Sequence, residues 1–130
     1  MDYSRQELVI GKKAQKQLEK SKVAIIGVGA LGSLSSELLV RSGVKKLILF
    51  DNDFIEMSNL QRQHLYKLDD VNKPKVKVAK RYLKEVNPNV SIKEYFMSLT
   101  ANNIKKLNKV DLILDCTDNM QTRFLLNDFC

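Results

Sequence analysis

The feature that most constrains the fold is a glycine-rich loop between a short apolar strand and a helix. The β-branched run at 22–26 leads directly into GVGALG at residues 27–32. Leucines at 31, 34, 38 and 39 then recur at helical spacing as far as Gly43, a typical helix stop, and we expect them to face the protein core. A strand that turns through G-x-G-x-x-G into a helix is typical of nucleotide-binding α/β sheets.

Each glycine of this loop has an expected role. Gly27 allows the tight turn, Gly29 lets the backbone come close to a phosphate, and Gly32 lets the helix pack on the strand. The following helix N-terminus offers free N–H donors and a positive dipole end to an anion. The alternative is a purely structural turn.

The rest of the chain continues the alternation of strands and helices. We expect a first helix at 4–20 with Leu8, Gly11, Ala14 and Leu18 on one face, and an irregular segment at 54–72. Alternating strands and helices predict an α/β fold with a mostly parallel, Rossmann-like sheet flanked by helices. The sequence predicts further strands at 47–50, 90–96 and 110–115, and further helices at 74–87, at 101–108 and from Asp118 to the end.

Polar motifs follow the predicted strands, where ligands bind in parallel sheets. Asp51 ends the second strand, where a carboxylate can bind the ribose of NAD, FAD or adenosine, although it could be a plain loop aspartate. Arg62, in the segment SNLQRQ at 58–63, can donate bidentately to a phosphate, and Lys75 can add a point charge, although both could be ordinary surface residues. Asp118, in DCTDN at 115–119, could hold Mg²⁺ or cap the final helix.

Composition excludes several classes of protein. The 130 residues suit one domain, and no apolar run is long enough to span a membrane. The net charge is +7, but the lysines are spread along helices, so a nucleic-acid partner stays open without being favoured. Cys116 and Cys130 form no CxxC pair, so we expect buried thiols in a cytoplasmic protein and no zinc site. His64, the lone histidine, is expected to be structural or exposed.

Taken together, these segments identify a family. The chain resembles, over residues 3–130, the amino-terminal part of the ThiF/MoeB/HesA proteins, relatives of ubiquitin-activating enzymes. SNLQRQ and DCTDN at this separation are far more specific than the glycine loop. The matches run in order through Tyr3-Ser4-Arg5-Gln6, GVGALG, Asp51-x-Asp53, SNLQRQ, Lys73-Pro74-Lys75, Asn87-Pro88 and DCTDN.

The resemblance implies a single ATP-binding adenylation domain over 1–130. MgATP and the Gly-Gly tail of a ubiquitin-like sulfur-carrier protein would give an acyl-adenylate and pyrophosphate. Asp51 would hold the ribose, Asn59, Arg62 and Lys75 the phosphates, and Asp118 the Mg²⁺. Arg5 would act from the partner subunit of a homodimer. The implied nucleotide-binding set also includes Gly27, Gly29, Ala30, Gly32, Asp53, Ser58 and Asn119.

The main departure from the family is length. Family members continue beyond the helix after DCTDN, so the sheet is expected to end early, with an exposed edge. Three alternatives stay open: adenylation of a peptide or a modified tRNA base, a truncated nucleotide-binding module without turnover, and an NAD(P)-dependent oxidoreductase. SNLQRQ and DCTDN argue against the last, because hydride transfer does not need so many phosphate ligands.

Overall fold

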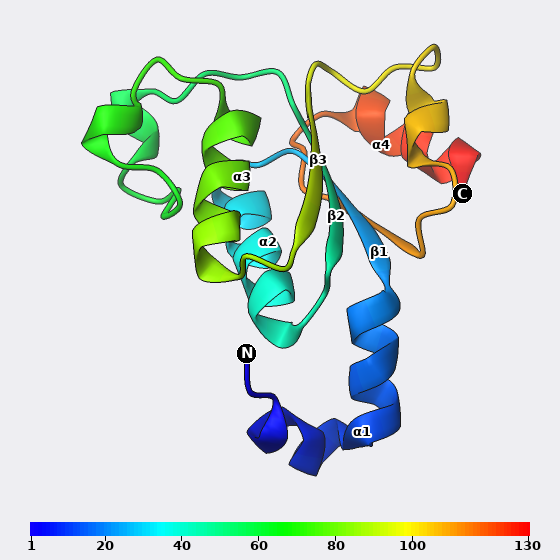
Figure 1. The fold of residues 1–130 in the computed structure, drawn as a ribbon. Coiled ribbons are helices and arrows are strands. Elements are labelled where there is room, and N and C mark those ends of the chain that lie inside the picture. The colour runs from blue at the N-terminus through cyan, green and yellow to red at the C-terminus, as the bar shows by residue number, and fades with distance from the viewer.

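The computed structural model describes residues 1–130 and has a four-stranded sheet at its centre (Figure 1). The strands lie in the order β3-β2-β1-β4 and every neighbouring pair is parallel, so the predicted α/β, Rossmann-like fold class is confirmed. β3 and β4 are the edge strands. The strands are β1 (Lys22–Ile26), β2 (Lys46–Asp51), β3 (Ser91–Phe96) and β4 (Leu112–Asp115).

The central strands are buried on both faces because helices cover the sheet from both sides. α2 (Ala30–Ser42) and α3 (Lys75–Val86) lie on one face, and α4 (Met120–Phe129) lies on the other (Figure 1). β1 and β2 are therefore continuous apolar runs rather than alternating ones. Two of the expected helices differ in detail: 101–108 forms only a 3₁₀ turn at Ile104–Leu107, and the last helix starts at Met120.

The helix predicted at 74–87 is confirmed as α3. Pro74 precedes its first residue, and Val76, Ala79 and Leu83 are buried against the sheet side as their spacing predicts. Together with α2 and the two central strands, α3 encloses the larger of two apolar clusters. The smaller cluster lies under α4 and includes Ile26, Phe50 and Leu126.

The expected core face of α2 is wrong at three of its four leucines, since only Leu39 packs on the larger cluster. Leu31 and Leu38 are 60% and 55% exposed, and Leu34 is exposed as well. The buried residues of α2 are instead Gly32, Ser33, Ser36, Glu37 and Val40. The helix starts directly from the glycine loop and lies too close to it for large side chains. Small residues therefore occupy the contact, and Leu31, Leu34 and Leu38 face outward.

The first helix, α1 (Ser4–Lys20), is broken at Gly11, whose φ of 80° is not helical. The expected face at 8, 11, 14 and 18 is therefore only partly formed: Leu8 is 84% exposed, whereas Leu18 packs on the larger cluster. Gln15 is the buried residue of α1, and its amide donates to the carbonyl of Ser42 at the end of α2. α1 extends from the end of the sheet where β1 begins (Figure 1).

The chain order creates a switch point beside β1. After β1 the chain adds β2 and β3 on one side, then returns to place β4 on the other. The carboxyl ends of β1, β2 and β4 meet there, since Ile26 lies opposite both Phe50 and Asp115. The predicted irregular segment at 54–72 contains only two short 3₁₀ turns, Met57–Asn59 and Leu68–Asp70. No helix in the structure is long and apolar enough to cross a membrane.

Candidate nucleotide site

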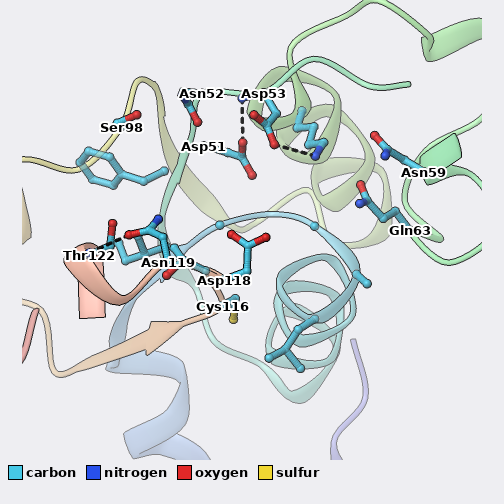
Figure 2. Close-up of a pocket in the computed structure, with 18 of the residues that line it drawn as sticks. Asp51, Asn52, Asp53, Asn59, Gln63, Ser98, Cys116, Asp118, Asn119 and Thr122 are labelled. Atoms are coloured by element: carbon cyan, nitrogen blue, oxygen red, sulfur yellow. Dashed lines mark hydrogen bonds and ion pairs between the residues drawn. The ribbon is translucent and has the colours of Figure 1, made fainter. Parts of the chain in front are cut away.

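A cavity of about 750 Å³ opens at this switch point, within the usual size range of small-molecule sites. Figure 2 shows polar side chains reaching it from the strand ends and from the loops around them. Its walls are the glycine loop, the end of β2, the 56–63 segment, the first residue of α3, the 97–99 loop and the loop from β4 into α4. The sequence motifs predicted to bind a ligand therefore converge on one cavity.

The structure confirms the expected steric roles of two glycines. Gly27 has a φ of 90°, and a Cβ there would lie 2.9 Å from the carbonyl oxygen of Cys116. A Cβ on Gly32 would lie 1.9 Å from the carbonyl oxygen of Gly27, so the helix could not pack. Gly32 shapes the loop without lining the cavity, whereas Gly27, Gly29 and Ala30 all line it.

Asp51 connects the end of β2 to the glycine loop. Its carboxylate accepts hydrogen bonds from the backbone N–H of Val28 at 2.7 Å and of Asp53 at 2.8 Å. Burial raises the pKa of Asp51 above its usual value, and these two backbone donors offset part of that rise. Each oxygen keeps acceptor capacity, so the carboxylate is oriented and still able to accept from a ligand hydroxyl.

Lys75 is not the surface residue that its position would allow. It is only 5% exposed, yet its ammonium lines the cavity and lies 3.1 Å from the exposed carboxylate of Asp53. The N–H of Lys75 also donates to the carbonyl of Asp53. The Lys75 ammonium is buried and its one ion-pair partner, Asp53, faces solvent. An anionic ligand in the cavity can therefore replace Asp53 as the partner of this ammonium.

The SNLQRQ segment is divided between the cavity and its outer side. Asn59 lines the cavity, and its Oδ1 accepts from the N–H of Glu56, which leaves Nδ2 free to donate. Arg62 also lines the cavity and donates to the carbonyl of Ser58. Ser58 itself, expected at the nucleotide, lies outside, and its hydroxyl donates to Glu56.

The loop after β4 corrects one expectation. Asn119, not Asp118, caps the last helix, accepting from the N–H of Thr122 at 2.7 Å. The carboxylate of Asp118 has no hydrogen bond or ion pair within the chain and projects toward the middle of the cavity (Figure 2). The helix-cap interpretation of Asp118 is therefore wrong, and its carboxylate is available to a ligand.

Arg5 does not belong to this cavity. It lies near the start of α1, and α1 extends from the opposite end of the sheet (Figure 1). The chain's own Arg5 is thus separated from the other expected catalytic residues.

The remaining titratable candidates are only partly as expected. His64 is partly exposed, and it has a partner that sequence spacing does not reveal, Glu37 of α2 at 2.5 Å. Both cysteines are free. Cys116 is half-buried beside the glycine loop, and burial raises the pKa of its thiol. Cys130 is exposed, so its expected burial is wrong.

Several residues that line the cavity are not predicted to do so from the sequence. Gln63 is buried, and its N–H donates to the carbonyl of Asn59, so the two side chains lie one helical turn apart. That four-residue spacing is visible in the sequence, but no hydrophobic period marks 54–72 as helical. Asn52, Phe54, the 97–99 loop and Thr122 also line the cavity.

The comparisons with known proteins agree with this geometry. The model of the ThiF family matches residues 3–130. The chain belongs to the ThiF family. Its ThiF-family relatives include the sulfur carrier protein ThiS adenylyltransferases of Bacillus subtilis, 47% identical over 97% of this chain, and of Escherichia coli, 40% identical over the whole chain. The matches cover 39% and 53% of those proteins.

A solved structure is also similar to this chain. It is that of E. coli MccB with ATP, which superposes with a TM-score of 0.90 at 33% identity. The match covers 98% of this chain and 40% of MccB. This chain thus spans about half or less of the length of these three proteins.

Proposed function

We propose that this chain is the ATP-binding part of an enzyme that adenylates the C-terminal carboxylate of a ubiquitin-like sulfur-carrier protein. One observation carries the proposal: a single cavity at the switch point unites the glycine loop, Asp51, Lys75 and Asp118. The names of the ThiF-family relatives, which are sulfur-carrier adenylyltransferases, support the same reaction.

The chemistry needs no general base, because a C-terminal carboxylate is already ionised at neutral pH. One of its oxygens forms a bond to the α-phosphorus while the bond from that phosphorus to the bridging oxygen breaks, and pyrophosphate leaves. What the chain must supply is alignment of the two reactants and neutralisation of charge on the phosphates. In the proposed roles, Asp51 binds the ribose hydroxyls, and Asn59, Arg62 and Lys75 donate to phosphate oxygens.

The charges at the cavity suit a nucleotide that arrives with a cation. Its lining residues include four carboxylates, of Asp51, Asp53, Glu56 and Asp118, against two cations, Arg62 and Lys75. A tetra-anionic nucleotide without further positive charge would be repelled by that balance. The proposal therefore includes Mg²⁺, whose contribution is to neutralise phosphate charge.

The residues present fit such an ion. The chain has no cluster of three or more His, Cys, Asp or Glu side chains able to hold a metal by itself. Mg²⁺ at nucleotide sites is held by one or two carboxylates together with phosphates and water, so a cluster is not required. Asp118 meets that need, because its carboxylate has no other partner and projects into the cavity.

The proposal includes a homodimer. Arg5 lies away from the chain's own cavity, so it can reach phosphates only from a second copy. Two sets of apolar side chains are exposed and available for such an interface: Leu8 and Val9 on α1, and Leu31, Leu34 and Leu38 on α2. Leu31 also lines the cavity, so a copy packed on α2 would lie beside the site.

The test is ATP–pyrophosphate exchange by this chain, with and without a carrier protein that ends in Gly-Gly. We expect radiolabel from pyrophosphate to enter ATP only when the carrier is present, with ATP binding measured in parallel by calorimetry. A carrier with its terminal glycine deleted is the matched control. Binding of NAD⁺ in preference to ATP, or exchange that ignores the carrier, would refute the proposal.

A further inference from the structure

Tyr66 is a buried residue of the irregular 54–72 segment whose hydroxyl the proposed roles do not use. The residue belongs to the larger apolar cluster, is 5% exposed and does not line the cavity. Its hydroxyl donates to the carbonyl of Val28, the second residue of the glycine loop, at 2.6 Å. Phenylalanine would fill the same space without a polar group to bury, so packing alone does not explain the hydroxyl.

The hydrogen bond from Tyr66 is one of three that fix consecutive peptide groups of the glycine loop. The N–H of Gly27 donates to a carbonyl at the end of β2, and the N–H of Val28 donates to the carboxylate of Asp51. The next peptide group, between Val28 and Gly29, has no partner on the sheet, and the hydroxyl of Tyr66 is the donor to its carbonyl. The orientation of this peptide group therefore depends on Tyr66.

That orientation determines which atom of the peptide group faces the cavity. A trans peptide group is planar, and its C=O and N–H point in opposite directions. Tyr66 holds the carbonyl on the buried side of the loop, so the N–H of Gly29 is directed to the other side, where Gly29 lines the cavity. This N–H has no hydrogen-bond partner within the protein. It is therefore free to donate to an anion.

A flip of this peptide group would reverse the arrangement. Gly29 has no Cβ, so it adopts the backbone angles of either orientation at little steric cost. With the carbonyl turned into the cavity, an acceptor would face the phosphates and the N–H donor would be lost. Burial raises the pKa of Tyr66 above its usual value, so at neutral pH the hydroxyl stays protonated and holds the carbonyl in place.

We propose that Tyr66 is a positioning residue that holds the Val28–Gly29 peptide group with its N–H toward the phosphates of a bound nucleotide. The inference rests on the proposed function, because it requires a phosphate at the glycine loop. It deepens that function by assigning control of phosphate binding to a residue outside the cavity. Tyr66 acts through the loop backbone and does not touch the nucleotide.

The test compares Tyr66→Phe with Tyr95→Phe in the complete chain. Both changes remove a hydroxyl and keep the ring, and Tyr95 is partly buried and does not line the cavity, so it is the matched control. MgATP is titrated by calorimetry well below the Tm of each chain. We expect Tyr66→Phe to weaken MgATP binding about tenfold and Tyr95→Phe to change it less than about twofold. Replacing Tyr66 with 4-aminophenylalanine, which keeps a donor at the end of the ring, should restore most of the affinity.

An NMR measurement separates orientation of the loop from stability of the fold. In the unaltered chain, MgATP should shift the amide signal of Gly29 and slow its exchange with water, because the N–H gains an acceptor. In Tyr66→Phe without ligand, the signals of Val28 and Gly29 should broaden through exchange between two orientations, whereas in Tyr95→Phe they should stay sharp. A loss of stability alone would not broaden this one peptide group selectively.

The possible outcomes distinguish this inference from the proposed function. Normal MgATP affinity in Tyr66→Phe overturns the inference alone, as does an unaltered chain in which bound MgATP leaves the Gly29 signal unchanged. A Tyr66→Phe chain that does not fold assigns the hydroxyl to stability and overturns the inference as well. An unaltered chain that binds no MgATP refutes both proposals.

Discussion

Two glycines of one loop are needed for different physical reasons. Gly32 has no room for a methyl group, because its Cβ would overlap the carbonyl oxygen of Gly27 at 1.9 Å. At Gly29 the nearest protein atom to an added Cβ is Nε2 of Gln63 at 3.6 Å, an ordinary contact. No contact within the chain excludes a Cβ at 29, whereas a phosphate close to the backbone would.

Alanine substitutions should separate these reasons. Gly32→Ala should destabilise the fold by about 3 kcal/mol through overpacking, whereas Gly29→Ala should change stability by less than about 0.5 kcal/mol. Gly29→Ala should nevertheless lower ATP affinity about tenfold. Urea unfolding and calorimetric titration measure the two effects. Full ATP affinity in Gly29→Ala would contradict a close approach of phosphate to this backbone.

The unpaired carboxylate of Asp118 leads to a second prediction. Asp118→Asn keeps the size of the side chain and removes the charge, so Mg²⁺-dependent pyrophosphate exchange should fall by more than about 100-fold. The Tm should stay within about 2 °C, because the carboxylate has no partner to lose. Exchange at the normal rate would exclude Asp118 from the metal site.

Site residues could be predicted from the sequence where they directly follow a strand or a motif. Asp51 and Asp118 were found because strand ends converge in a parallel sheet. Nothing in the sequence distinguishes Gln63, which lines the cavity, from Ser58, which does not, although both belong to SNLQRQ. Which side chains of an irregular segment face inward depends on its local turns, and those turns leave no hydrophobic period in the sequence.

Among the helices, α2 shows that hydrophobic periodicity does not decide which face of a helix is buried. The leucine spacing correctly indicates an amphipathic helix, but the packed face is the one carrying Gly32, Ser33 and Ser36. Helical spacing indicates that the two faces of the helix differ in polarity. Which face is buried depends here on the close approach of the helix to the glycine loop. α3 has no such restriction, and there the apolar face is the buried one.

Asp70 connects the irregular 54–72 segment to α3. Burial alone would raise its pKa, but hydrogen bonds from the Arg81 guanidinium and the Lys67 N–H, with Lys73 nearby, hold the pKa below its usual value. A carboxyl group with a lowered pKa in the folded state stabilises the fold above its unfolded pKa of about 3.9 and loses that contribution as pH falls further.

Asp70→Asn should therefore cost about 2 kcal/mol at pH 7 and progressively less below about pH 4. Urea unfolding of both chains across this range measures the difference. Asp69→Asn, at an exposed neighbouring residue, is the control and should change little at any pH. A cost that does not depend on pH would show that packing, rather than charge, holds this segment to α3.

At the scale of the whole molecule, the proposed dimer can be tested by complementation. Arg5→Ala and Arg62→Ala should each abolish most carrier-dependent exchange. In an equal mixture, half of the dimers are mixed and each has one intact site, so activity should return to about a quarter of normal. Arg5→Ala should keep its Tm, since Arg5 is exposed. A mixture as inactive as its components would place Arg5 outside the shared site.

The topology of the sheet was predictable only in part. Alternating elements correctly predict parallel strands, since crossover helices impose them. The order β3-β2-β1-β4 was not predicted, because nothing local to Leu112–Asp115 records that this strand returns to the far side of β1.

The late return of β4 has a consequence for how the chain matures. The backbone of Lys22 meets the carboxylate of Asp111 across 89 residues, so this closure has a high entropic cost and is expected to come late in folding. A chain still being synthesised can form the glycine loop while it lacks the wall supplied by Cys116–Asn119. A nucleotide that binds both walls recognises only chains that have closed. At 100 times its Kd it would add about 2.7 kcal/mol to their stability, so the cell's own ATP would act as a folding ligand.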